Sequence, residues 1–274
     1  MRAPLPLPPR DPAIGLFLEA IHRDCNRAGR LDRDPLALLG PYRTVADREV
    51  AGFIAATLAF GRVDLIMGAV STALAPLGAH PAAALAAMAE AEIVRAFSDF
   101  QYRYCFPSDL IGIMLAVKKA RAAFGSLEGL FAEGDRGGET VEPALEAFSL
   151  RMNELGRRRG KAIRAGLIPA PSRGSACKRL FLYLRWMVRR DEIDPGGWKS
   201  ITPSRLVIPL DVHMARVCHE RLGFIPTGAA TLANALRATA CFRLYAPEDP
   251  VKYDFSLTRP GIDPAPGDEA WGCG

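Results

Sequence analysis

The stretch IPAPSRGSACKRLFLYLRWMVRR, residues 168–190, decides the fold of this chain. Pro169, Pro171 and Gly174 interrupt regular structure and predict a tight connection. From position 175 to about 190, apolar residues then occupy nearly every side of a helix, which is typical of a central, buried helix. Such a helix has to be covered by neighbours, so this stretch indicates a helical core.

The rest of the chain carries helical patterns and few strand patterns. Apolar residues recur at helical intervals, often after a cap residue or a proline. Asp47 is the expected cap of the second helix, and Asp249 with Pro250 the expected start of the last. A loop is expected over 133–141. The sequence predicts an all-α fold with helices over 11–30, 46–60, 62–76, 81–97, 108–124, 142–156, 175–190, 211–223, 228–244 and 250–259.

Composition indicates a globular chain with one large core or two moderate ones. Its 274 residues are 49% apolar and 24% charged, and no run of about 18 apolar residues predicts a membrane helix.

The proline-rich residues 1–10 are expected to form a flexible lead-in, and residues 263–274 (DPAPGDEAWGCG) a tail. The six cysteines form no C-x-x-C pair, so no metal or cluster cofactor is expected. Scattered cysteines fit a reducing cytoplasm.

Positive charge is concentrated in one segment. Residues 151–190 hold twelve Lys or Arg and one acid, which gives +11. Because the whole chain carries +5, the remainder carries −6. A field of one sign suits a polyanion such as nucleic acid, and the plainer alternative is a solvated basic face. Arg157, Arg158 and Arg159 are the leading candidates for phosphate contacts.

Two charged residues occupy unusual positions at predicted helix starts. Lys178 lies in the first turn of the most buried helix, where burial and the positive helix end both disfavour its ammonium form. It is therefore a candidate nucleophile, or a lysine whose charge reaches solvent. Asp211, in PLDVHMARVCHE (209–220), is a candidate helix cap. Capping and catalysis are compatible, because a cap carboxylate is held rigidly and can face a developing cation.

These elements together resemble the helix-hairpin-helix DNA glycosylases, the superfamily of endonuclease III and the 8-oxoguanine glycosylases. The proline-bearing hairpin, the lysine at a helix start and the segment IPLDVHMARV carry the resemblance. Residues 46–61, GSACKRLFLYLRWMVR, IPLDVHMARV and DPVKYDFSLTRPGI are similar to an uncharacterised bacterial family, DUF2400, placed in that superfamily. Asp211 follows Lys178 by 33 positions, and this separation is similar to that in the archaeal 8-oxoguanine glycosylase branch.

The resemblance implies a two-lobed fold with the active site in the cleft between the lobes. One lobe would be 46–211, with the helix-hairpin-helix element at about 163–190. The other would combine 11–45 with 212–262. The implied function is excision of a damaged base, an oxidised purine such as 8-oxoguanine, followed by cleavage of the strand through a lysine Schiff base.

The resemblance also implies residue roles. Lys178 and Asp211 would be catalytic, and the DNA would be a damaged duplex bound by a cytoplasmic, nucleoid-associated monomer. The usual hairpin reads L-P-G-V-G-x-K, whereas this one has a single glycine. The DNA-contacting set would be Arg173, Gly174, Ser175, Ala176 and Arg179 with Arg157, Arg158 and Arg159, and the base pocket would be Trp198, Phe60 and Asp254.

Two other classes of function fit the same residues. A non-catalytic binder of DNA structures would keep the fold and the affinity without base release. A structural or partner-binding helical protein would carry its basic face in solvent and bind DNA weakly. A metal site is not expected, because His213 and Cys218 are five residues apart on a helix and point in different directions.

Overall fold

The computed structural model describes residues 6–262, 264 and 268, and this part of the chain holds twelve α-helices and no β-strand. The prediction of an all-α fold is confirmed. The predicted tail falls almost wholly, and the lead-in in part, outside the described residues. The helices are α1 (Pro12–Cys25), α2 (Val45–Leu58), α3 (Val63–Leu74), α4 (Pro81–Ala87), α5 (Glu90–Ala96), α6 (Pro107–Phe124), α7 (Leu127–Gly134), α8 (Glu142–Leu155), α9 (Lys178–Val188), α10 (Val212–Arg216), α11 (Leu232–Arg243) and α12 (Asp254–Ile262).

Shorter helical turns connect these helices. Five are 3₁₀ turns, and the sixth, η6, is a π-helical turn that continues α10. They are η1 (Ala28–Arg30), η2 (Pro35–Leu39), η3 (Ala75–Leu77), η4 (Pro171–Arg173), η5 (Pro203–Arg205) and η6 (Val217–Arg221).

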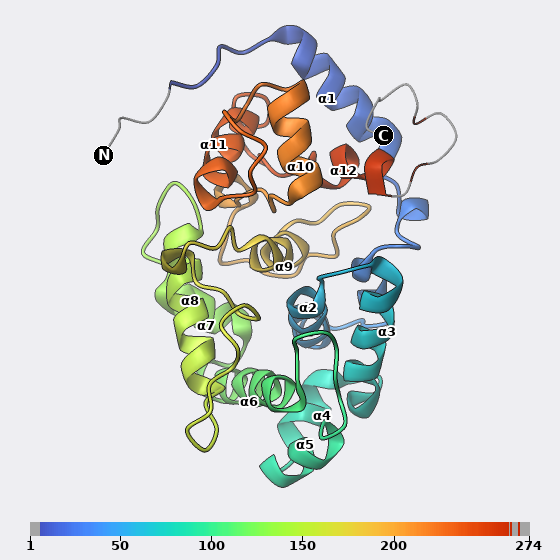
Figure 1. Ribbon diagram of the computed structural model, residues 1–274, viewed down its shortest axis with the longest axis vertical. Helices are drawn as coiled ribbons and strands as arrows, with labels where there is room; N and C mark the ends of the chain where they lie inside the picture. The colour runs from blue at the N-terminus through green and yellow to red at the C-terminus, as the bar shows by residue number, and fades with distance from the viewer. Residues whose placement is uncertain (1–5, 263, 265–267, 269–274) are drawn as a thin grey trace.

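Helix α9 runs through the middle of the molecule (Figure 1). The helices α2 to α8 lie below it in that view, and α1, α10, α11 and α12 lie above it. Helix α2 packs against α9, α6 packs against both α7 and α8, and α1 packs against α12. The chain therefore crosses between the two groups twice, once from α1 to α2 and once from α8 through α9 to α10.

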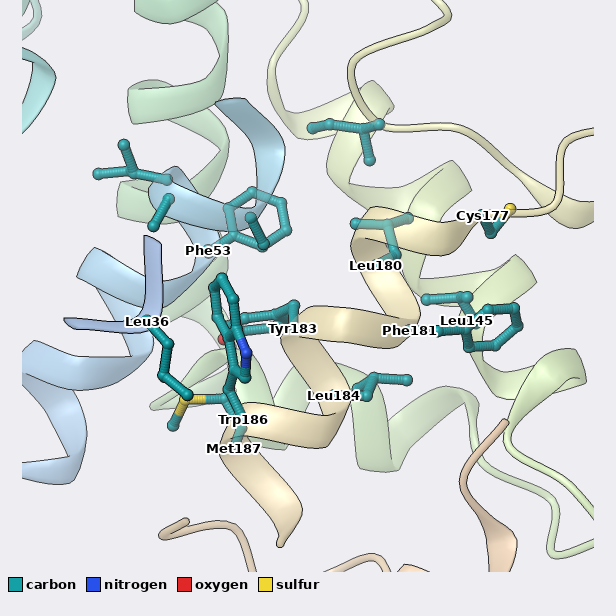
Figure 2. Close-up of a cluster of buried hydrophobic side chains, with 14 of the residues drawn as sticks. Leu36, Phe53, Leu145, Cys177, Leu180, Phe181, Tyr183, Leu184, Trp186 and Met187 are labelled. Atoms are coloured by element: carbon teal, nitrogen blue, oxygen red, sulfur yellow. The ribbon is translucent and has the colours of Figure 1, made fainter. Parts of the chain in front are cut away.

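The core is built around α9, as its apolar sequence predicts. Tyr183 and Trp186 are fully buried, and Phe53 of α2 meets the Tyr183 ring edge-on at 5.3 Å between centroids. Figure 2 shows Tyr183 turned toward Phe53 and Phe181 turned toward Leu145 of α8. Burying side chains of this size contributes about 1.5–3 kcal/mol each, so the position of α9 is fixed on several sides.

Several helix ends differ from those the sequence predicts. Helix α2 is capped by Thr44, whose Oγ1 accepts from the Asp47 amide at 3.0 Å. Asp47 is buried and instead accepts from the Ala82 amide at 3.0 Å, which ties α2 to α4. The helix predicted over 81–97 is broken at Met88, whose backbone is extended. Helix α12 begins at Asp254, four residues beyond Pro250, after a series of turns.

In the helix-hairpin-helix element predicted at about 163–190, the structure has no α-helix before α9. Residues 165–167 form a turn, and η4 begins at Pro171 after three residues without helical structure. Pro169 and Pro171 have no amide hydrogen, so a helix here would lose two of its hydrogen bonds. Gly174 takes the left-handed conformation with φ 77°, which lets the chain turn into α9.

Much of the charge of segment 151–190 is neutralised inside the fold. Arg185 and Arg189 are buried and both bind Asp194, which is fully buried between them. Arg185 also binds Asp254 at 2.5 Å, and Arg189 binds Asp249 at 2.8 Å. Burial raises the pKa of Asp194 to about 6 despite both arginines. The sequence charge of +11 therefore overstates the positive field at the surface.

No single helix in the described part of the chain is long and apolar enough to cross a membrane. One bent pair, Val63–Leu77 with Pro81–Ala87, passes that test by length and composition alone.

Candidate functional site

Lys178 and Asp211 meet at the first residue of α9 and the N-cap of α10. The Lys178 Nζ lies 3.1 Å from Asp211 Oδ2. The other carboxylate oxygen, Oδ1, accepts from the Met214 amide at 2.8 Å. Asp211 is therefore both the cap of α10 and the ionic partner of Lys178. The side chain of Lys178 is 35% exposed and that of Asp211 18%, so the pair sits at the edge of the solvent.

The surroundings of Asp211 favour its ionised form. Burial raises the pKa of this carboxyl, but the Lys178 ammonium and the Met214 amide more than offset that effect. The net result is a pKa below the usual range for aspartate. Asp211 is thus a carboxylate at neutral pH, and it holds a negative charge beside the amine.

The backbone before Lys178 is held in an unusual conformation. Cys177 has φ 49°, in the left-handed region that residues other than glycine rarely adopt. Its amide donates to Ser175 Oγ at 3.1 Å, and its buried thiol lies 3.6 Å from the Pro169 carbonyl oxygen. Within the described structure the amides of Ser175 and Ala176 have no acceptor. Both residues line the cleft described next.

The lysine and the carboxylate line a cleft of about 850 Å³. One wall is the turn between α2 and α3, where Phe60, Gly61 and Arg62 lie. A second part of the lining comes from α12, with Asp254, Phe255, Thr258 and Arg259. This volume lies within the range of about 300–1,000 Å³ found for small-molecule sites, and it accommodates one nucleotide or a ligand of similar size.

Asp254 faces the cleft from the start of α12. Its side chain is 6% exposed, and its Oδ2 is bound by Arg185 Nη1. Burial raises the pKa of Asp254, and Arg185 opposes that shift. Asp254 is therefore a buried polar group held within the protein, and it also reaches the same cavity as Lys178.

Phe60 lies at the turn between α2 and α3, in a stack of rings. Its ring is stacked on Tyr104 at 4.3 Å, and the Arg179 guanidinium lies 5.0 Å from the Phe60 centroid. Arg179 also donates to the carbonyl oxygens of Thr57 and Gly166. Arg179, expected to contact DNA, is thus engaged in joining α2 to the hairpin.

Trp198 lies in the core, away from the cleft, contrary to the expected base-stacking position. It is 4% exposed, its Nε1 donates to Glu49 Oε1 at 3.1 Å, and its ring meets that of Tyr183 edge-on. No face of Trp198 is open to a base. Local sequence did not reveal this, because Glu49 lies 149 residues away.

The Arg157–Arg159 turn and Arg173 also lie outside the cleft. Arg158 Nε binds Glu90 of α5 at 2.8 Å, and Arg159 takes the left-handed φ of 46° in the turn. Arg173 is exposed at the end of η4. These four arginines do not belong to the site formed by Lys178 and Asp211.

Sequence reasoning missed several cleft residues. Val212, directly after Asp211, is 69% exposed and faces the cleft. Tyr104 does not itself line the cleft, but it is exposed and stacks on the cleft residue Phe60; its neighbour Arg103 has φ 50°. An exposed valine at a helix start could have been noticed. Nothing in the local sequence predicts that the rings of Phe60 and Tyr104 stack.

The described residues contain no group of three or more His, Cys, Asp or Glu side chains arranged to hold a metal ion.

A family model described as protein of unknown function, DUF2400, matches residues 34–263. The chain belongs to the DUF2400 family. The match begins before η2 and takes in α2 to α12, so the DUF2400 region includes Lys178, Asp211 and both parts of the cleft lining. No curated protein and no solved structure matches the chain.

Proposed function

We propose that this DUF2400 protein is a DNA glycosylase with associated AP-lyase activity, acting on an oxidised purine such as 8-oxoguanine in duplex DNA. The observation that carries the proposal is the 3.1 Å contact between Lys178 and Asp211 inside a cleft of nucleotide size. A lysine nucleophile needs a nearby group that takes its proton and stabilises a cation. Asp211 is placed for both roles.

The proposed reaction begins when the Lys178 ammonium, which is paired with the Asp211 carboxylate, loses one proton to solvent and becomes the free amine. Its Nζ attacks C1′ of the deoxyribose, and the C1′–N bond breaks with its electron pair leaving on the base. The proton lost by Nζ passes to the departing base, with Asp211 as the relay. As positive charge grows on the sugar, the Asp211 carboxylate stabilises it.

Strand cleavage follows from the same covalent adduct. The C1′–O4′ bond opens to leave a Schiff base on Lys178. Loss of a C2′ proton then expels the 3′ phosphate by elimination, and hydrolysis of the Schiff base regenerates the amine. The reaction forms and breaks bonds without any change in the oxidation state of the protein.

The substrate has to be extruded from the duplex to reach Lys178, at a cost of a few kcal/mol. The open amides of Ser175 and Ala176, at the start of α9, supply N–H groups for a phosphate of that nucleotide. In this proposal Gly174 lets the backbone approach that phosphate closely, a role that two glycines have in the usual hairpin. We propose α9 and this hairpin as a reduced helix-hairpin-helix element, in a monomer bound to the bacterial nucleoid.

The two helix groups on either side of α9 support a two-lobed interpretation. In this interpretation, 46–211 forms one lobe and 11–45 with 212–262 the other. The proposed active site lies at their junction, since Lys178 belongs to the first and α10 to the second.

A panel of duplexes, each with one damaged base, tests the proposal. We expect the wild-type protein to release 8-oxoguanine and cut the strand, and Lys178→Gln to do neither. Lys161→Gln is the matched control, because Lys161 lies outside the cleft. Failure of the wild-type protein to release a base from any duplex of the panel would contradict the proposal.

A further inference from the structure

The chain that leads into α9 is held by side chains of neighbouring helices. Residues 162–170 contain no helix in the described structure. The Arg164 amide donates to Asp109 of α6 at 2.9 Å, and the Gly166 carbonyl oxygen accepts from Arg179 of α9. Because an unpaired backbone group away from water is costly, these side chains take the place of the hydrogen bonds that a helix would supply.

One face of α8 binds the next part of this segment. Ser149 Oγ donates to the carbonyl oxygens of Pro169 at 2.8 Å and Ile168 at 3.2 Å. Asn153 Nδ2 also donates to the Ile168 carbonyl oxygen, at 2.9 Å. Residues three and four positions apart share a face of a helix, so Glu146, Ser149 and Asn153 face the hairpin together. We call these three residues the α8 clamp.

Glu146 holds the hairpin at η4. Its Oε2 accepts from the Ser172 amide at 2.8 Å, and its Oε1 accepts from the Ser172 hydroxyl at 2.7 Å. Both oxygens of one carboxylate therefore bind a single residue. Ser172 lies two positions before Gly174, where the left-handed backbone turns the chain toward α9. The clamp thus fixes the hairpin on the near side of that turn.

The clamp reaches Lys178 through Cys177. The Pro169 carbonyl oxygen that accepts from Ser149 also lies 3.6 Å from the Cys177 thiol. Cys177 has φ 49°, and residues other than glycine keep such a conformation only where their surroundings fix it. Lys178 follows directly, as the first residue of α9. A shift of Pro169 therefore moves the residue that sets where α9 begins.

We propose that the α8 clamp positions Lys178 against Asp211, and that Ser149 and Glu146 are positioning residues for the reaction. The inference rests on the proposed function, in which the Lys178 amine has to meet C1′ of an extruded nucleotide. Neither positioning residue lines the cleft, so each acts through the hairpin. A misplacement of about 1 Å caused by a distant substitution can lower a rate by about 10²-fold.

Ser149→Ala is the first test, because it removes one hydroxyl from a fully buried side chain and adds no atoms. Single-turnover base release from an 8-oxoguanine duplex is measured at saturating protein, so that affinity does not enter, and Tm is measured on the same preparation. We expect the saturating rate to fall by about 10–100-fold. A lower Tm with an unchanged rate for the folded protein would overturn the inference.

Ser256→Ala is the matched control. Ser256 is also a fully buried serine, it belongs to α12, and it does not line the cleft. This change should leave the saturating rate as it is in the wild-type protein. An equal fall in rate for both serine variants would overturn the inference, because the effect would then not depend on the hairpin.

Glu146 offers a second pair of variants, which keeps the test valid if Ser149→Ala does not fold. Glu146→Ala removes both contacts with Ser172, and we expect a loss in rate of about 10-fold or more. Glu146→Gln keeps an oxygen for the Ser172 amide, so it should restore most of the rate. Glu154→Ala is the control on the same helix, because Glu154 is 65% exposed and pairs with Arg151. No loss in Glu146→Ala, or a loss that Glu146→Gln does not restore, overturns the inference.

A measurement without DNA separates this inference from the proposed function. Limited reductive methylation with formaldehyde and cyanoborohydride, followed by mass spectrometry, reports how freely the Lys178 amine reacts. The Asp211 carboxylate, 3.1 Å from Nζ, should slow this reaction in the wild-type protein. Ser149→Ala and Glu146→Ala should speed it by about 2–5-fold, the range that a partly exposed ion pair supplies, as should Asp211→Asn.

The two readouts fail in different ways. An unchanged methylation rate of Lys178 in both clamp variants overturns the inference, whatever the protein does to DNA. Faster methylation in the clamp variants, combined with no base release by the wild-type protein from any duplex, overturns the proposed function alone and leaves the clamp as the element that holds Lys178 on Asp211.

Discussion

Replacing Asp211 with Asn separates the capping role of this residue from its charge. Asn is as good an N-cap as Asp, so the hydrogen bond to the Met214 amide survives. The change removes the attraction across 3.1 Å to Lys178, which is about 5 kcal/mol before desolvation at an effective dielectric of 20. Because Lys178 is 35% exposed, the net loss in the free energy of unfolding is about 1 kcal/mol or less. That corresponds to a fall in Tm of about 2–4 °C.

The expected effect on the reaction is much larger. Removing a charge that acts in the transition state costs about 10²–10³-fold in rate. Single-turnover base release and thermal unfolding are measured on the same preparation. Asp11→Asn is the control, because Asp11 caps α1 through the Ala13 amide at 2.8 Å and lies outside the cleft. A large fall in Tm with an unchanged rate for the folded fraction would show that Asp211 is only a cap.

The pH dependence of stability checks the same charge. The pKa of Asp211 is lowered in the folded protein. Its contribution to the free energy of unfolding is therefore fully present above the pKa of the unfolded state, and it is lost as the pH falls through the pKa of the folded state. Asp211→Asn should therefore lose more stability at pH 7 than at pH 3. An equal loss at both pH values would contradict the ion pair.

Three further changes test the surrounding structure. Arg185→Met leaves Asp254 buried without its cation and Asp194 with Arg189 alone. It should lower the free energy of unfolding by about 3–5 kcal/mol in denaturant titration, and a neutral effect would contradict the buried cluster. Gly61→Ala should cost about 1–3 kcal/mol, because φ is +105° and a Cβ would meet Tyr102 OH at 3.0 Å. Gly68→Ala, in α3 with open space, should instead be neutral or stabilise by up to about 1 kcal/mol. Replacing Arg157, Arg158 and Arg159 together should leave the salt dependence of DNA affinity unchanged, whereas loss of three phosphate contacts would lower the log–log slope by about 2.7.

The sequence predicted the helices with the strongest periodicity, and it predicted α9 at the centre. Apolar residues on nearly every side of 180–188 leave no solvent-facing surface, so burial follows from local sequence alone. The break at Met88 and the late start of α12 were not predictable in this way. Both ends depend on packing against other helices, which overrides local propensity.

The same contrast between local sequence and long-range contacts applies to the candidate site. Lys178 and Asp211 could be singled out because each stands at a helix start, where its type of charge is chemically informative. Trp198 follows Gly196 and Gly197, a local sequence typical of a loop, but its contacts with Glu49 and Tyr183 hold it in the core. The charge of 151–190 was also misleading, since Arg185 and Arg189 are neutralised by acids up to 69 residues away. Ion pairs between residues so far apart in the sequence cannot be predicted from local sequence patterns.

The central claim, that Lys178 forms a covalent intermediate with DNA, is tested most directly by borohydride reduction. The wild-type protein is mixed with a duplex that carries one 8-oxoguanine, and the reduced adduct is digested and mapped by mass spectrometry. The account predicts a cross-link on the peptide that contains Lys178, and no cross-link with Lys178→Gln. A cross-link that persists in Lys178→Gln, or none with the wild-type protein on 8-oxoguanine or abasic duplexes, would contradict it.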